Sequence, residues 1–169
     1  MSNNPFSFWR PNPAFIAEIA DYLKEKQVLE VFAGNGLMAS YLAERGVEIQ
    51  STSYFKGYDY SSQQMYYPVV EMGAIEAIKA YGHQADTLLM IWPEANNQAH
   101  LAARLFFEIH ADNPDASLVY IGEKTIIEKN ILGGCATDPF FADFGKVIHP
   151  FQHYSGNYIE VAEVLRPSF

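Results

Sequence analysis

Short apolar segments alternate with helical patterns along the first three quarters of the chain, and this rhythm is the strongest constraint on the fold. The apolar segments span residues 27–32, 47–53, 67–72, 86–92 and 117–122. Apolar residues at helical spacing fill most of the intervals before and between them, at 13–26, 37–45, 73–81 and 96–111. Strands that alternate with helices favour a parallel sheet with helices on both faces.

The rhythm changes after residue 122. Residues 123–143 read as a long, glycine-containing connection with a short helix at 139–143. Residues 146–151 and 158–165 are apolar or alternating, and the turn-rich sequence HYSGN at 153–157 separates them. This pattern predicts a hairpin, which adds antiparallel pairing at one side. The predicted fold is therefore an α/β, Rossmann-like, mostly parallel sheet of seven strands.

The length of 169 residues predicts one domain. We assign residues 13–169 to it, and residues 1–12 to an irregular arm with Phe6, Phe8 and Trp9 as aromatic anchors. Asn12 and Pro13 are typical of a helix start, in which a capping side chain precedes proline.

Composition and charge restrict the partners and the cellular location that we expect for this chain. Hydrophobic residues make up 49% of the chain, enough for a packed core. No apolar run reaches the roughly 18 residues of a membrane helix, so no membrane partner is expected. Cys135 is the single cysteine, which excludes an internal disulfide and favours a cytoplasmic location. A net charge of −9 without a basic run disfavours nucleic acid as a partner.

A glycine turn follows the first predicted strand, in the sequence VLEVFAGNG at residues 28–36. In open parallel sheets, ligands bind beyond the carboxyl ends of the strands. Glycine lets the backbone approach a ligand closely, and the following helix presents free N–H groups there. The turn is therefore the leading candidate for a ligand site.

This segment resembles the first motif of class I S-adenosylmethionine-dependent methyltransferases, in which an acidic residue precedes a glycine-rich turn. Glu30 matches the acidic residue, and Gly34 and Gly36 match the two later glycines. Phe32 stands where the first glycine is usual, as in members whose turn reads F-A-G-x-G. The resemblance implies a methyltransferase fold with a closing hairpin. It also implies S-adenosyl-L-methionine as cofactor, held by Glu30, Ala33, Gly34, Asn35 and Gly36.

A narrower resemblance rests on three later segments. The runs DTLLMIWP at 86–93, VYIGE at 119–123 and GGCATD at 133–138 are similar to a group of bacterial and fungal methyltransferase-like proteins. That group carries W-P-P after the fourth strand, Y-I/V-G-E at a strand end, and G-G-C-T-x-D-x-F. Here Glu94 replaces the second proline and Ala136 precedes the threonine.

The first resemblance also implies contacts with the nucleoside. Ser53 stands where the family usually has an acidic residue that binds the ribose hydroxyls, and Asp59 follows as a second candidate. The alternative for Asp59 is a solvated loop residue. Glu71, Met72 and Gly73 occupy the adenine side. For Met72 the alternative is ordinary core packing.

The acceptor side is expected after the fourth and fifth strands. Trp92, Pro93 and Glu94 stand where amino-methylating enzymes carry an N/D-P-P-Y/F motif. Trp92 cannot accept a hydrogen bond, so that chemistry is not expected, and Trp92 and Pro93 are assigned to the cofactor wall. Glu94 and Glu123 are candidate general bases. Their alternatives are bonding to loop backbone and recognition of a cationic substrate.

No metal site is predicted, because the histidines lack partners at ligand spacing. The leading hypothesis is methyl transfer to a small-molecule substrate, with the arm and the loop 54–66 closing the site. One alternative is a non-catalytic protein that binds S-adenosylmethionine. Another is a protein-interaction module of the same fold.

Overall fold

The computed structural model describes residues 11–55 and 64–169. It contains one seven-stranded sheet in the order β3-β2-β1-β4-β5-β7-β6. The strands are β1 (Gln27–Val31), β2 (Glu48–Ser53), β3 (Val69–Glu71), β4 (Thr87–Ile91), β5 (Ser117–Glu123), β6 (Lys146–Pro150) and β7 (Glu160–Arg166). Strands β1 to β5 pair in parallel, and β7 lies antiparallel between β5 and β6. The predicted parallel sheet and closing hairpin are confirmed.

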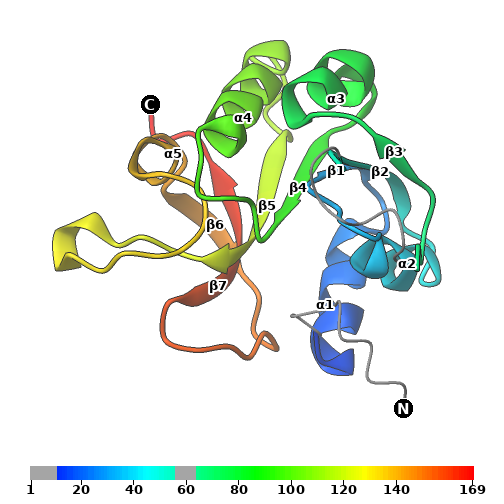
Figure 1. The fold of residues 1–169 in the computed structure, drawn as a ribbon, viewed down its shortest axis with the longest axis horizontal. Coiled ribbons are helices and arrows are strands. Elements are labelled where there is room, and N and C mark those ends of the chain that lie inside the picture. The colour runs from blue at the N-terminus through cyan, green and yellow to red at the C-terminus, as the bar shows by residue number, and fades with distance from the viewer. Residues whose placement is uncertain (1–10, 56–63) are drawn as a thin grey trace.

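Helices cover both faces of the sheet, as predicted. The helices are α1 (Pro13–Leu23), α2 (Leu37–Ala43), α3 (Ala74–Tyr81), α4 (Gln98–Ile109) and α5 (Asp138–Asp143), with short 3₁₀ turns η2 (Gly82–Gln84) and η3 (Ile127–Lys129). Figure 1 shows α3, α4 and α5 on one face and α1 and α2 on the other. Within the described residues, no helix combines the length and apolarity that crossing a bilayer requires.

Two apolar cores lie between the sheet and these helix layers. Successive side chains of a strand point to opposite faces. Leu88 and Met90 of β4 accordingly pack in the core beneath α3 and α4, while Leu89 and Ile91 pack in the core beneath α1. This two-sided burial explains why the central strands read as continuous apolar runs.

Several boundaries differ from the sequence predictions. α1 ends at Leu23, three residues early, because residues 24–26 turn the chain into β1. The third strand covers 69–71 instead of 67–72, since Pro68 has no N–H for the ladder. Gly46 takes the expected left-handed conformation after α2, with φ +83°. The connection after β5 contains η3 and a bridge between Ile126 and Ile131, which the sequence did not indicate.

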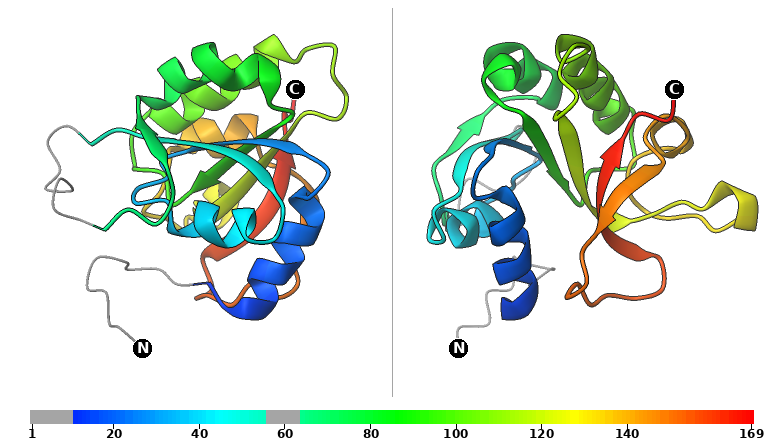
Figure 2. Two further views of the ribbon diagram at one scale, coloured as in Figure 1. Left: turned by 90° about the vertical axis from the view of Figure 1, so that its right-hand side faces the viewer. Right: turned by 180° about the vertical axis from the view of Figure 1, so that it is seen from behind.

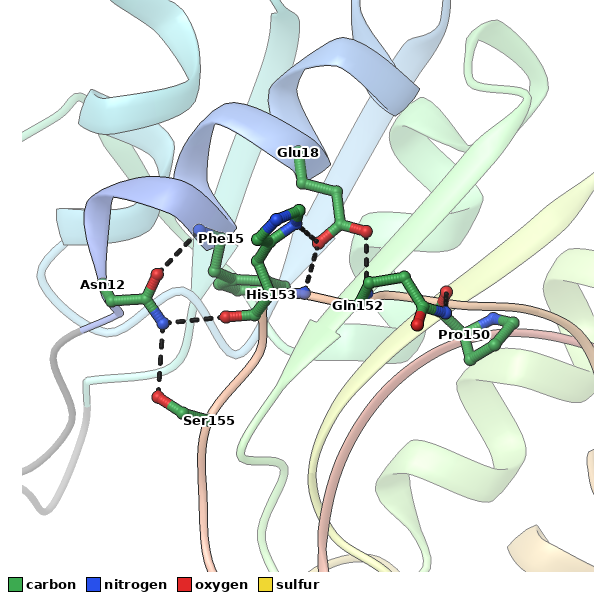
Figure 3. A network of polar contacts seen from close by, with 7 residues as sticks. All are labelled: Asn12, Phe15, Glu18, Pro150, Gln152, His153 and Ser155. Atoms are coloured by element: carbon green, nitrogen blue, oxygen red, sulfur yellow. Dashed lines mark hydrogen bonds and ion pairs between the residues drawn. The ribbon is translucent and has the colours of Figure 1, made fainter.

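A polar network fixes α1 to the connection between β6 and β7 (Figure 3). The Asn12 side chain caps α1 by accepting the Phe15 N–H at 2.8 Å, and it donates to the His153 carbonyl at 2.9 Å. The Glu18 carboxylate accepts the N–H groups of Gln152 and His153 at 2.7 and 2.8 Å. Burial pushes the pKa of Glu18 upward, but these donors outweigh it and lower the pKa below its ordinary value. The predicted helix start at Asn12 is confirmed.

Two features stand at the β6 side of the molecule. The outer strand β6 shifts register against β7 between Val147 and His149. The segment that includes η3 projects away from the sheet, as the yellow ribbon of Figure 1 and the right-hand view of Figure 2 show. Ile127 and Leu132 in this projection are exposed.

Candidate functional site

The glycine turn leaves β1 in an unusual backbone conformation. Phe32, Gly34 and Gly36 all lie in the left-handed region, with φ of +63°, +57° and +76°. That conformation is strained for any residue except glycine, so Phe32 is held there by its surroundings. A Cβ added at Gly34 would have no described heavy atom within 4 Å. The backbone of Gly34 therefore presents an open face, as a ligand cradle requires.

The other glycine of the turn packs against the chain that leads into β3. A Cβ at Gly36 would lie 2.9 Å from both the Tyr67 Cβ and the Val69 Cγ2. The Tyr66 N–H also donates to the Asn35 carbonyl at 2.9 Å. Gly36 is thus required for packing of the turn, whereas Gly34 borders open space.

The end of β2 supplies three consecutive hydroxyl side chains, Ser51, Thr52 and Ser53, which we call the hydroxyl run. Ser51 Oγ donates to the Glu30 carboxylate at 2.6 Å, and Thr52 Oγ1 donates to the Glu30 carbonyl at 3.1 Å. The Gly34 N–H donates to Ser53 Oγ at 3.1 Å. All three side chains are buried. Sequence analysis missed the roles of Ser51 and Thr52, although three successive hydroxyl residues at a strand end were a visible signal.

Most amides of the turn are bonded within the protein. The Ala33 N–H donates to the Thr52 carbonyl at 3.0 Å, the Gly34 N–H to Ser53, and the Gly36 N–H to the Ala33 carbonyl at 3.0 Å. Among the residues that the structure describes, the Asn35 N–H is the one amide of residues 33–36 without an acceptor. A ligand would therefore meet one donor and an open backbone surface here.

Glu30 lies beneath the turn and is only 1% exposed. Burial raises the pKa of its carboxyl to about 7, and the hydrogen bond from Ser51 acts in the opposite direction. A buried carboxyl of this kind is neutral in mildly acidic conditions, and a nearby cation would favour its charged form.

The residues predicted for the adenine side follow β3. Glu71 is exposed, whereas Met72 is partly buried and packs against the core beneath α3 and α4. The Met72 N–H donates to the Ser53 carbonyl at 2.9 Å, and the Gly73 N–H donates to the Glu76 carboxylate at 3.3 Å. Because β2 pairs in parallel with both β1 and β3, these residues lie at the same sheet edge as the turn.

Several predicted residues lie outside the described parts of the chain. They are Asp59 from the ribose prediction and the arm anchors Phe6, Phe8 and Trp9. Most of the loop expected to close the site, residues 56–63, falls there too.

The chain turns sharply where β4 ends. Trp92 has φ +50°, and its N–H donates to the Ile121 carbonyl of β5 at 2.7 Å. The Trp92 side chain packs against both cores, and Pro93 is buried. Glu94 is exposed, and its carboxylate accepts the Asn96 side-chain N–H at 2.9 Å. The residues assigned to the cofactor wall are therefore mainly packed, while Glu94 faces solvent.

The segment at 133–138 joins the ends of β4 and β5. The Gly134 N–H donates to the Glu123 carboxylate at 2.5 Å, and the Ala136 N–H donates to the Glu94 carbonyl at 3.2 Å. Cys135 between them is buried, and that burial raises the pKa of its thiol. The three segments of the narrower sequence resemblance thus meet at one place. Glu123 already bonds to loop backbone, which is one of the alternatives considered for it.

Comparison with known proteins bears on the fold. No family model matches the chain, and no curated protein matches its sequence. The structure of the mitomycin 7-O-methyltransferase MmcR is similar with a TM-score of 0.54 and 12% identity, over 90% of this chain and 53% of that one. Human N-acetylserotonin methyltransferase in complex with SAM is similar with a TM-score of 0.51 and 12% identity, over 89% and 50%.

This chain therefore spans about half the length of these two enzymes. At such low identity, the likeness concerns the fold. The fold is the class I methyltransferase fold, which confirms the fold prediction. The assignment to a bacterial and fungal group stays a prediction.

Proposed function

We propose that this chain binds S-adenosylmethionine at the glycine turn and transfers the methyl group to a small-molecule acceptor, as a cytoplasmic protein whose residues 13–169 form a single domain. The observation that carries the proposal is the open backbone face of Gly34, at the carboxyl end of β1 in a methyltransferase fold. In open parallel sheets this edge is where ligands bind.

The residues of the turn fit the amino-acid end of such a cofactor. Glu30 is a buried carboxyl close to the turn, suited to an ammonium group, and Asn35 retains an N–H donor for a carboxylate. Glu71, Met72 and Gly73 would border the adenine. When bound, the sulfonium supplies a methyl group that is already activated. The protein then has to orient the acceptor and exclude water, and orientation alone accounts for much of a rate enhancement.

The acceptor would enter beside Glu94 and Glu123. Their chain segments are joined through the 133–138 segment, so both belong to one wall. Either carboxylate would take a proton from an oxygen or nitrogen acceptor. The two similar structures are enzymes named for mitomycin and N-acetylserotonin, which supports a small acceptor. A net charge of −9 disfavours a phosphate backbone.

A second candidate function is binding of S-adenosylmethionine without methyl transfer. Ser53 stands at the position of the usual acidic ribose ligand, and its hydroxyl already accepts the Gly34 N–H. Trp92 stands where amino-methylating enzymes place a polar side chain. These substitutions favour a reduced or absent activity.

Calorimetry with S-adenosylmethionine and S-adenosylhomocysteine tests the site. Gly34→Asp places a carboxylate on the open face and should abolish binding. Gly46→Asp is the matched control, because Gly46 also has a positive φ and no described atom within 4 Å of an added Cβ. It lies beyond the far end of α2.

Unchanged affinity in Gly34→Asp would contradict the site, and equal losses in both variants would point to general destabilisation. Formation of S-adenosylhomocysteine with candidate small molecules separates transfer from simple binding.

A further inference from the structure

We propose that the hydroxyl run of β2 is the positioning element of the glycine turn, and that Ser53 serves the turn backbone in place of the ribose of the ligand. The statement about the ligand rests on the proposed function. The statement about the turn stands on the contacts of the protein alone.

The turn needs an external support because its backbone is strained. Phe32 holds a left-handed φ of +63°, and Gly34, two positions later, lies in the same region. An ordinary side chain such as that of Phe32 disfavours this conformation by about 1 to 2 kcal/mol. The chain does not keep such angles unless its surroundings over-determine them. The hydroxyl run contacts the chain on both sides of Phe32, at Glu30 and at Gly34.

Each hydroxyl of the run holds a different part of the turn. Ser51 bonds the Glu30 side chain and Thr52 bonds the Glu30 backbone, on the strand side. Ser53 bonds the Gly34 N–H on the far side, and the Thr52 carbonyl takes the Ala33 N–H between them. The bonds of Ser51 and Thr52 are buried and so are shielded from competing water, whereas the bond between Ser53 and Gly34 is part-buried beside the open face of the turn.

Ser53 is poorly placed to serve as the main ribose ligand as well. It is 8% exposed and already accepts one hydrogen bond. A hydroxyl has one uncharged oxygen, whereas a carboxylate has two charged oxygens that can accept hydrogen bonds from two adjacent hydroxyl groups. The geometry therefore assigns Ser53 to the turn, and a ligand without its 2′-hydroxyl should bind nearly as well as the complete one.

Amide hydrogen exchange tests the positioning role without any ligand. In Ser53→Ala, the Gly34 N–H should exchange about tenfold faster, because it loses its buried acceptor. Exchange of the core amide of Leu89 should stay unchanged. Ser40→Ala is the matched control, since Ser40 donates to the Leu37 carbonyl at 2.8 Å and does not bond Gly34. Ser53→Thr keeps the hydroxyl and should restore slow exchange.

Calorimetry with S-adenosylhomocysteine and its 2′-deoxy analogue tests the ligand statement. Ser53→Ala should weaken both ligands by the same factor, about tenfold. A loss confined to the ligand that carries the 2′-hydroxyl, with slow Gly34 exchange retained, would overturn the proposal. If Ser53→Ala fails to fold, the near-isosteric Ser53→Cys gives the same two measurements with a weaker acceptor.

The two measurements also separate this inference from the proposed function. If the unsubstituted protein binds neither ligand, the proposed function and the ligand statement fail together. The exchange rates still decide whether Ser53 positions the turn: faster Gly34 exchange supports that role, and unchanged exchange refutes it.

Discussion

The two halves of the candidate site are held together in different ways. The turn after β1 is held by hydrogen bonds with side-chain hydroxyls of β2, the neighbouring strand. The ends of β4 and β5 are instead joined by backbone N–H groups of Gly134 and Ala136, from a connection that lies later in the chain. The first half is therefore set before any ligand arrives. The second depends on a long connection, part of which, at Cys135, Ala136, Phe140 and Phe141, packs in the core beneath α3 and α4.

The most severe test of the first half is Gly36→Ala. The added Cβ would meet Tyr67 and Val69 at 2.9 Å, and the backbone has φ +76°. Strain and overpacking together should lower the free energy of unfolding by about 3 to 4 kcal/mol, measured by urea denaturation. Gly46→Ala meets no described atom within 4 Å and should lose only about 1 kcal/mol. Equal losses would show that the turn is not packed as described.

A second test concerns the charge beneath the turn. Burial raises the pKa of Glu30 to about 7, above its ordinary value of 4.5. The folded state therefore holds this proton more tightly than the unfolded state. The stabilisation that the protonated Glu30 carboxyl gives the folded state is complete below about pH 4.5. It is lost as the pH rises to about 7, and the loss in the free energy of unfolding is about 2 to 3 kcal/mol.

Glu30→Gln should remove this part of the pH dependence in urea denaturation while keeping the side-chain volume. In the unsubstituted protein, S-adenosylhomocysteine should bind more tightly as the pH rises through 7, because its ammonium group favours the charged carboxyl. Affinity that is independent of pH between 5 and 8 would contradict the placement of the ammonium near Glu30.

The independence of the second half is tested by Gly134→Ala. The added Cβ would lie 2.7 Å from Glu123 Oε2, and this flexible carboxylate can move aside. Stability should fall by no more than about 1 kcal/mol. If Glu123 acts on the acceptor, turnover should fall about tenfold with unchanged S-adenosylhomocysteine affinity. A parallel loss of affinity would show that the two halves are coupled.

The smallest effect is expected at the α1 contact with the β6–β7 connection. Glu18→Gln should lower stability by about 0.5 to 1 kcal/mol at pH 7, because the amide accepts less strongly from Gln152 and His153. The pKa of Glu18 is lowered in the fold, so the difference should be complete above about pH 4.5 and disappear as the pH falls through the lowered pKa. A difference that persists in acid would exclude this charge as its source.

The contrast between the two halves of the candidate site also explains which of its contacts could be predicted from the sequence and which could not. The glycine turn and the hairpin are local patterns, and the sheet follows from their order along the chain. The hydrogen bond between Gly134 and Glu123 joins two segments that come together only in the folded chain. No local sequence pattern therefore predicts it. The third strand was predicted too long because its apolar run includes Pro68, which cannot join the ladder. At Phe32 the fold overrides the local preference of the residue, because a non-glycine residue takes the left-handed conformation that glycine favours.

The outer strand β6 has a consequence for the behaviour of the protein at high concentration. A long, regular outer strand invites other chains to pair with it and grow into fibrils. Here Lys146 begins the strand, the register shifts between Val147 and His149, and Pro150 ends it without an N–H group. These interruptions leave too short a template for a second molecule, so concentrated solutions should resist fibril growth from this side.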